Sequence, residues 1–165
     1  MFRRPDFRND NERQGRTVVT WFMDSSALVK RYVREQGSKW LRAEITHHSV
    51  IIAQITAVEV VAALRKRFRQ GDISEFAFYQ ARKRFITHVA RQQYQVVTMN
   101  SQIVDEAMRI ASDQDLRAYD AVQLATALAI IPPSNTSRLV FLTADDDLEV
   151  ASQAEGLKTE NPLNH

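Results

Sequence analysis

Apolar runs alternate with amphipathic stretches along this chain. The runs are rich in β-branched and aromatic residues and almost free of polar positions. Such runs are typical of strands that are covered on both faces of a sheet. We predict strands at Val18–Met23, Val50–Ile55, Tyr94–Met99 and Leu139–Leu142, and a last, short strand at Leu157–Thr159.

Segments of helical period lie between these runs, bounded by hydroxyl or acidic caps and by glycines. The predicted helices are Ser25–Glu35, one that begins at Ser38, Ala57–Gln70 behind a Thr56 cap, one from Asp72 to about Gln92, one that begins at Asn100 or Ser101, Ala118–Ile131 and Asp146–Ala154. Asp72 and Glu75 suggest a capping box for the fourth of these. The residues expected to face inward are Phe76, Tyr79, Phe85 and Val89 in the fourth helix, and Ile103, Val104, Ala107, Met108 and Ala111 in the fifth.

The alternation of strands and helices predicts an α/β fold. We expect a three-layer α/β/α sandwich with a mostly parallel central sheet of four to five strands. The length of 165 residues suits one domain, which we place at residues 17–160. Residues 1–16 lack periodicity and most large apolar groups, so we expect a disordered or loosely docked tail. Residues 161–165 are expected to form a C-terminal tail.

The composition excludes several kinds of chemistry. The chain has no cysteine, so disulfides, thiolate nucleophiles and cysteine-ligated zinc are excluded. Its four histidines do not form a set with ligand spacing. No apolar run approaches the roughly 18 residues of a membrane span, and residues 1–16 are too polar for a signal peptide. We therefore expect a cytoplasmic protein with no membrane partner.

Charge is distributed unevenly, although the formal net charge is only +2. Residues 65–91 carry eight basic and two acidic side chains, whereas residues 105–160 carry eleven acidic and four basic ones. A basic region that faces an acidic one suits an anionic polymer bound beside a cation site. The same pattern fits two solvated helix faces that partly neutralise each other, and charge alone does not decide between these interpretations.

Four acidic residues stand out against apolar surroundings. Asp24 ends the first apolar run, and Asp145 follows the last long one in the same way. Glu59 is the only charge in residues 55–64, and Asp120 is the only charge in residues 119–131. A carboxylate in such a setting loses hydration, for which a cation, strong hydrogen bonds or protonation must compensate.

Together, these four carboxylates suit a hard divalent cation. Mg²⁺ and Mn²⁺ prefer oxygen ligands and keep several waters, and their typical role is in phosphate chemistry. Taken singly, each acid has a simpler explanation. The two that follow strands could cap helices, and the two within helices could pair with Arg65 or Arg117.

Four segments together resemble the PIN-domain family, specifically the VapC-type toxin ribonucleases of bacterial toxin–antitoxin pairs. They are residues 22–30 (FMDSSALVK), 56–64 (TAVEVVAAL), 116–125 (LRAYDAVQLA) and 142–145 (LTAD), the last followed by Leu148 and Gly156. The likeness extends from Thr20 to Thr159. Such toxins usually begin almost at their first strand, whereas a longer segment precedes Asp24 in this chain.

The resemblance implies roles for individual residues. The acidic site, which would hold Mg²⁺ or Mn²⁺, would consist of Asp24, Glu59, Asp120 and Asp145. Asp24 and Asp120 would be the direct ligands. The hydroxyls of Ser26 and Thr143 would orient carboxylates or water behind them. Asp147 has a family counterpart whose role is less defined, and we choose Asp145 because it directly follows the strand.

The resemblance also implies a function. A metal-activated water would hydrolyse RNA phosphodiester bonds, leaving a 5′-phosphate and a 3′-hydroxyl. The residues that could guide the RNA backbone are Arg65, Lys66, Arg67 and Arg69. The expected partners are RNA, a cognate antitoxin protein and a second copy of the chain in a homodimer. Two alternatives stay open: a PIN-fold nuclease of RNA processing or DNA repair, and a non-catalytic partner-binding domain.

Overall fold

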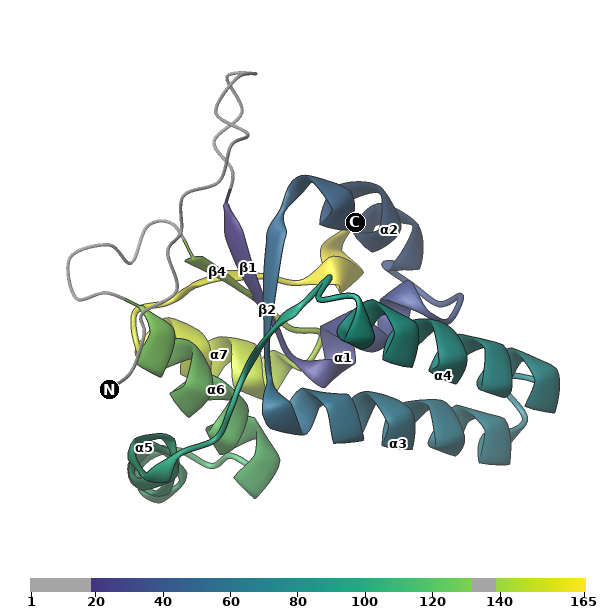
Figure 1. The fold of residues 1–165 in the computed structure, drawn as a ribbon. Coiled ribbons are helices and arrows are strands. Elements are labelled where there is room, and N and C mark those ends of the chain that lie inside the picture. Colours follow the sequence, from purple (N-terminus) through teal and green to yellow (C-terminus); the bar gives the residue numbers. More distant parts are fainter. Residues whose placement is uncertain (1–18, 132–138) are drawn as a thin grey trace.

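The central feature of the fold is a five-stranded parallel sheet (Figure 1). The structure is a computed structural model and describes residues 19–131 and 139–165. The strands are β1 (Thr20–Met23), β2 (Ser49–Ala53), β3 (Gln95–Val97), β4 (Leu139–Leu142) and β5 (Lys158–Glu160). Their spatial order is β3-β2-β1-β4-β5, and every neighbouring pair is parallel.

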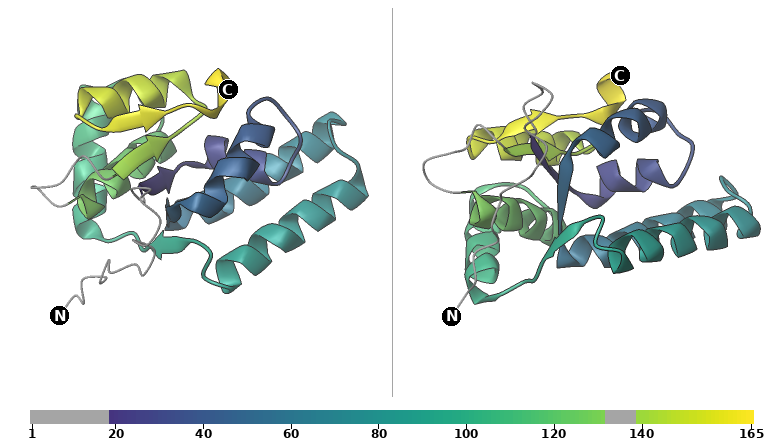
Figure 2. Two further views of the ribbon diagram at one scale, coloured as in Figure 1. Left: turned by 90° about the horizontal axis from the view of Figure 1, so that it is seen from above. Right: turned by 45° about the horizontal axis from the view of Figure 1, so that its top comes forward.

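Helices connect the strands and cover both faces of the sheet, which confirms the predicted α/β/α sandwich. The α-helices and the short 3₁₀ helices (η) are α1 (Ser25–Leu28), η2 (Val29–Arg31), α2 (Ser38–Glu44), η3 (Ile45–His47), α3 (Gln54–Gln70), α4 (Glu75–Ala90), α5 (Ser101–Asp113), α6 (Ala118–Ile130), α7 (Asp146–Ala154) and η5 (Pro162–Asn164). Helices α3 and α4 form an antiparallel hairpin that extends away from the sheet (Figures 1 and 2). Within the described residues, no helix is long and apolar enough to cross a membrane.

Two hydrophobic cores lie on opposite faces of the sheet, because successive side chains of a strand point to opposite sides. Trp21 and Met23 pack with residues of α1 to α4, whereas Phe22 packs with residues of α5 to α7. Phe22 stacks there on Phe141 of β4, with ring centroids 5.3 Å apart. The central strands are therefore buried on both faces, which explains why they read as continuous apolar runs.

The winding of the chain reverses at β1. From β1 the chain passes to β2 and β3 on one side, and then returns through α5 and α6 to β4 and β5 on the other. In open parallel sheets, ligands bind outside the carboxyl ends of the strands at such a reversal. This topology predicts that a ligand binds next to the residues that follow Met23 and Leu142.

Several predicted boundaries were wrong. The helix expected over residues 25–35 is a single turn, α1, followed by η2. Helix α3 begins at Gln54 rather than behind a Thr56 cap, because the apolar Ile55 belongs to the helix and not to the strand. The predicted tail at residues 1–16 lies outside the described residues.

Helix α4 differs most from its prediction. Ser74 caps the helix instead of Asp72, and its Oγ accepts a hydrogen bond of 3.1 Å from the amide of Ala77. Phe76 and Tyr79, which were expected to face inward, are 73% and 54% exposed. The buried positions of this helix are Phe78, Ala81 and Phe85.

Helix α5 is also rotated relative to its prediction. Val104, Met108 and Ala111 were expected to face inward but are exposed. The buried positions are Ile103, Ala107 and Ile110, which follow a spacing of four and then three residues. Asn100, one of the two residues predicted to begin this helix, is its cap. The side-chain oxygen of Asn100 accepts a hydrogen bond of 3.0 Å from the amide of Ile103.

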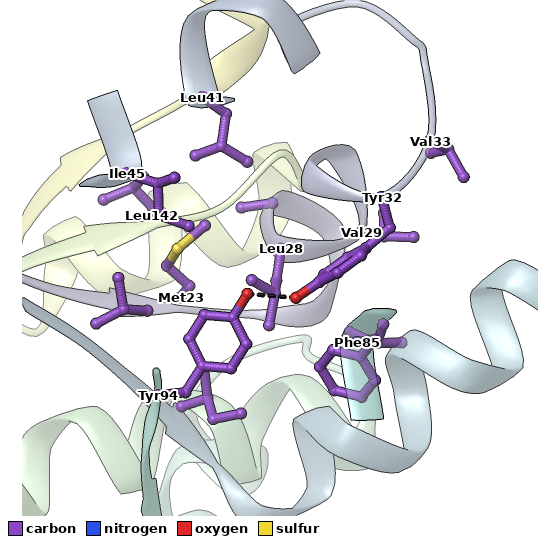
Figure 3. Packing of buried hydrophobic residues seen from close by; sticks show 14 of the residues in the cluster. Met23, Leu28, Val29, Tyr32, Val33, Leu41, Ile45, Phe85, Tyr94 and Leu142 are labelled. Atoms are coloured by element: carbon purple, nitrogen blue, oxygen red, sulfur yellow. Dashed lines mark hydrogen bonds between the residues drawn. The ribbon is translucent and has the colours of Figure 1, made fainter. Parts of the chain in front are cut away.

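A partly buried polar network fastens the end of α4 to η2 and to the start of β3, and Figure 3 shows the hydrogen bond between Tyr32 and Tyr94 within it. The Tyr32 hydroxyl hydrogen-bonds both the Tyr94 hydroxyl and Nδ1 of His88, the latter at 2.7 Å. Arg31 Nη1 donates to the Tyr94 hydroxyl at 2.5 Å. Burial raises the pKa of both tyrosines, so both stay protonated and able to donate. The network joins η2, the start of β3 and the end of α4.

Residues 161–165, which were expected to form a tail, pack against α2 and belong to the domain. Pro162 is buried, and the ring of His165 stacks on Trp40 with centroids 4.1 Å apart. Gly37, which precedes α2, has φ +80°, and a Cβ at this position would overlap the carbonyl oxygen of Pro162. The docked segment therefore leaves room only for glycine at residue 37.

We predict that Gly37→Ala destabilises the protein more than Gly71→Ala. Both glycines have nearly the same φ, +80° and +81°, but a Cβ at Gly71 would have no neighbour within 4 Å. Backbone strain should cost each variant about 1 kcal/mol, and the overlap with Pro162 should raise the cost of Gly37→Ala to about 3 kcal/mol. Urea denaturation measures both losses. Equal losses would mean that residues 161–165 do not dock on α2.

Candidate active site

The four acids of the acidic site all lie around the carboxyl edge of the sheet where its winding reverses. Asp24 directly follows β1 and caps α1, and Asp145 follows β4 and caps α7 by accepting from the amide of Leu148 at 3.0 Å. Glu59 lies in the second turn of α3, and Asp120 lies in the first turn of α6. Two acids thus come from strand ends and two from the helices that flank them.

Asp24 is the most deeply buried of these acids, with 3% of its surface exposed. Its Oδ1 accepts hydrogen bonds from the amide of Ala27 at 3.1 Å and from Oγ of Ser26 at 2.9 Å. Burial raises the pKa of Asp24 to about 7, against the lowering effect of these hydrogen bonds. Without a cation nearby, this carboxylate is therefore only partly ionised at neutral pH.

Two hydroxyls join the ends of β1 and β4. Ser26 Oγ, which donates to Asp24, accepts from the amide of Ala144 at 2.8 Å and lies 3.3 Å from Oγ1 of Thr143. Thr143 Oγ1 in turn accepts from the amide of Asp145 at 3.0 Å. Ser26 thus contacts a carboxylate directly, whereas Thr143 fixes the backbone that carries one.

Glu59 is held by a buried pair that the sequence patterns did not reveal. The hydroxyl of Thr56 donates to Oε1 of Gln123 at 3.0 Å, and Nε2 of Gln123 donates to Oε2 of Glu59 at 2.5 Å. Burial raises the pKa of Glu59, and the neighbouring Asp120 raises it further, while Gln123 and Ser25 lower it. Gln123 lies in an otherwise apolar helical run, which was the one signal that could have identified it.

Arg117 bridges the remaining two acids. Its Nε lies 3.1 Å from Oδ2 of Asp120, and its Nη2 lies 3.0 Å from Oδ2 of Asp145. Burial raises the pKa of Asp120, as do Asp145 and Asp147, whereas Arg117 lowers it. Arg117, which was considered as a partner for Glu59 or Asp120, therefore pairs with Asp120 and also with Asp145.

The four acids act on one another electrostatically. Glu59 contributes to the raised pKa of Asp24, Asp120 contributes to that of Glu59, and Asp145 contributes to that of Asp120. Yet within residues 19–131 and 139–165, no three acidic or histidine side chains surround one point closely enough to hold a metal ion. Two of the four carboxylates face the guanidinium of Arg117 instead.

The side chains of the acidic site are nevertheless chemically suited to bind a divalent cation. All four side chains offer carboxylate oxygens, which hard cations such as Mg²⁺ and Mn²⁺ prefer. Among the described residues, no positive charge near Asp24 is strong enough to hold the pKa of this buried carboxylate in the ordinary range. A cation beside Asp24 would supply that compensation.

Two of the four basic residues of α3 make side-chain contacts within the fold. Arg67 donates to Oε2 of Glu35 from Nε at 3.0 Å and from Nη2 at 2.7 Å. The guanidinium of Arg65 lies over the ring of Phe68, 4.9 Å from its centroid. The two bases that remain exposed and outside these contacts are Lys66 and Arg69.

The sequence of residues 21–153 matches the family model described as PIN domain. This chain belongs to the PIN domain family. The matched range includes the acidic site together with Ser26 and Thr143. PIN domain proteins are nucleases, so the family identifies this chain as a nuclease by class. The placement of acids at the carboxyl edge of the sheet agrees with that class.

Solved structures share the PIN fold with this chain. PAE2754 from Pyrobaculum aerophilum is 24% identical with a TM-score of 0.60, and the match covers 86% of this chain and 89% of that one. A toxin–antitoxin complex from Klebsiella pneumoniae is 20% identical with a TM-score of 0.53, and the match covers 78% and 89%.

One curated relative has a different description. The transcription elongation factor GreA of Mycoplasma pneumoniae is 26% identical over 140 residues, covering 84% of this chain and 80% of that protein. Identity at this level does not assign a family by itself, whereas the PIN domain model and the fold agree with each other. The PIN domain assignment therefore stands.

We predict that Asp24→Asn stabilises the metal-free protein in a pH-dependent way. Because the folded-state pKa of Asp24 is raised to about 7, the folded protein binds the proton more tightly than the unfolded chain does. This contribution to stability is fully present below about pH 4 and is lost as the pH rises to 7 and above. Asparagine carries no charge, so the variant should gain about 3 kcal/mol over wild type at pH 8 and little at pH 4.

Urea denaturation in the presence of EDTA at both pH values measures this difference. Asp146→Asn is the control, because Asp146 is exposed and its removal should change stability by less than about 0.5 kcal/mol. A gain for Asp24→Asn that is the same at pH 4 and pH 8 would contradict the raised pKa.

Proposed function

We propose that this PIN domain protein is a metal-dependent endoribonuclease, the VapC-type toxin of a toxin–antitoxin pair. The observation that carries the proposal is the buried Asp24 carboxylate at the winding reversal, with Glu59, Asp120 and Asp145 around it. An acidic site of this kind repels a phosphate backbone unless a divalent cation neutralises it. The proposal therefore joins the acids, the cation and a phosphodiester substrate in one site.

The residues have distinct tasks in this proposal. Asp24 and Asp120 would be direct ligands, and Ser26 would hold the Asp24 carboxylate in the ligating orientation. Glu59, whose pKa is raised by burial, is suited to accept a proton from the attacking water. When bound, Mg²⁺ or Mn²⁺ would supply the Lewis acidity for in-line attack of water on phosphorus. Asp145 would complete the acidic site, with Thr143 fixing its backbone.

RNA would approach along α3. Lys66 lies seven residues after Glu59, which is two helical turns and about 10 Å along the same face of the helix. Arg65 points about 120° away from that face, and Arg67 is paired with Glu35. Of the four bases of α3 considered, Lys66 is thus the best placed to contact a phosphate beside the acidic site.

The proposed partners are an antitoxin protein and a second copy of the chain. The Klebsiella pneumoniae structure is of a toxin–antitoxin complex, and its fold is that of this chain. An antitoxin that reaches the acidic site could satisfy the acids with a basic side chain and so prevent cation binding. Homodimer formation rests on the resemblance to VapC-type toxins and can be measured by sedimentation.

Cleavage of RNA by the purified protein in Mn²⁺ or Mg²⁺ tests the proposal. We expect Asp120→Asn and Asp145→Asn to lower the rate by at least about 100-fold, because each removes a charge from the cation site. The matched control is Asp146→Asn, next to Asp145 but exposed on the first turn of α7, which should cleave at nearly the wild-type rate. Equal rates for wild type and both site variants would rule out this mechanism.

Two alternatives give different results in simple experiments. A PIN-fold nuclease of RNA processing or DNA repair would not arrest growth when expressed without its neighbour gene, whereas a toxin would. A non-catalytic partner-binding domain would show the same thermal stability with and without Mn²⁺. The acidic site favours the nuclease, because burial raises the pKa of three of its four acids. Burying these carboxylates costs folding stability at neutral pH, and a purely structural domain has no reason to keep them there.

We further predict that Lys66→Ala weakens RNA binding more than Arg65→Ala does. Loss of one phosphate contact should raise KM about threefold and reduce the slope of log KM against log salt by about one. Arg65→Ala should have a smaller effect, because its guanidinium lies over Phe68 and away from the face of Glu59. The same KM for both variants would show that RNA does not follow this face of α3.

A further inference from the structure

Arg117 is an exposed cation that sits among the residues of a site built for another cation. Its side chain is 81% exposed, yet it pairs with Oδ2 of both Asp120 and Asp145. Asp145 uses its other oxygen, Oδ1, to cap α7. The guanidinium therefore occupies the oxygen of Asp145 that remains for a ligand.

From this arrangement we propose that Arg117 competes with the divalent cation in the free protein and binds an RNA phosphate once the cation has displaced it. The proposal rests on the proposed nuclease function and adds a residue to it. A guanidinium and a divalent cation beside the same carboxylate oxygens repel each other at close range. Binding of one therefore weakens binding of the other, which is a coupling between two ligands of one site.

The exposure of Arg117 makes the release inexpensive. Exposed ion pairs contribute between zero and about 1 kcal/mol each, because water solvates the separated charges nearly as well. Arg67 provides a contrast within the same molecule, since its side chain is only 24% exposed and donates twice to Glu35. Arg67 is fixed in the fold, whereas Arg117 can leave its partners.

The position of Arg117 determines what it contacts after release. It is the cap residue of α6, with extended φ and ψ of −65° and 152°, three residues before Asp120. The side chain is thus tethered at the rim of the acidic site, where a phosphate bound to the cation would lie. A guanidinium offers a planar pair of donors that matches two phosphate oxygens, which a lysine cannot reproduce.

The two roles change two measurements in opposite directions. Removing Arg117 removes the competing charge, so Mn²⁺ should bind more tightly to the RNA-free protein. Removing it also removes the phosphate contact, so KM for RNA at saturating Mn²⁺ should rise. A residue that only positions the acids would instead weaken Mn²⁺ binding when removed, and a residue with a phosphate contact alone would leave Mn²⁺ binding unchanged.

The experiment is calorimetric titration of Mn²⁺ into the full chain without RNA, followed by RNA cleavage kinetics at saturating Mn²⁺. For Arg117→Ala we expect about fivefold tighter Mn²⁺ binding and about a tenfold higher KM. Arg117→Lys keeps the charge but not the paired donors, so its Mn²⁺ affinity should stay near wild type while its KM rises about threefold.

Arg109→Ala is the matched control. Arg109 also bridges acids, with Nη2 2.7 Å from Glu106, Nη1 3.1 Å from Asp113 and Nη2 2.9 Å from Glu155. These acids lie outside the acidic site, so this variant should change neither Mn²⁺ affinity nor KM. If Arg109→Ala changed the Mn²⁺ affinity as much as Arg117→Ala does, the effect would come from the loss of any positive charge, and the proposal would be overturned.

The outcomes separate this proposal from the proposed function. Mn²⁺ binding by wild type that is lost in Asp120→Asn supports the metal site, and equal or weaker binding by Arg117→Ala then overturns the competition. An unchanged KM in Arg117→Ala overturns the phosphate contact. If neither wild type nor Arg117→Ala binds Mn²⁺, both the metal site and the competition are overturned. If Arg117→Ala binds Mn²⁺ and wild type does not, the competition is supported.

Discussion

The arrangement of side chains at the carboxyl edge of the sheet depends on the burial of the Asp24 carboxylate. The strand before it is covered on both faces, and Met23 before Asp24 and Leu28 after it are both fully buried in the core. Two hydrogen bonds to one oxygen offset part of the lost hydration, but the pKa of the group stays raised to about 7. A cation bound beside this carboxylate would stabilise its ionised form. Because the chain belongs to a family of nucleases, such a cation would also have a role in catalysis.

The positions of the acids were predictable because they break strong patterns, whereas the faces of the helices were not. Asp24 and Asp145 end buried parallel strands, and the topology of an α/β sheet then brings such ends together. Helix α4, in contrast, contains two apolar stripes, one with Phe76 and Tyr79 and one with Phe78 and Phe85. Both have helical spacing, so the period alone cannot decide which stripe is buried.

Side-chain partners were the least predictable part of the acidic site. Gln123 and Thr56 lie 67 positions apart in the chain, and only the packing of α6 against α3 lets Gln123 contact both Thr56 and Glu59. Arg117 was considered as a partner of one helix acid, but its contact with Asp145 depends on the β4–α7 connection reaching the start of α6. Contacts between elements distant in sequence follow from the completed fold, and local patterns carry no information about them.

The aromatic stack around α2 has a practical consequence for spectroscopy. The chain contains two tryptophans, and they stack on each other with centroids 5.7 Å apart, with His48 on Trp21 and His165 on Trp40. Trp21 is the second residue of β1, and Trp40 lies on α2, which leads through η3 into the amino end of β2. Intrinsic fluorescence of this protein therefore reports the integrity of the α2 end. Emission from these two tryptophans reports poorly on ligands at the carboxyl edge of the sheet. Ligand binding at the acidic site therefore has to be followed with a separate probe.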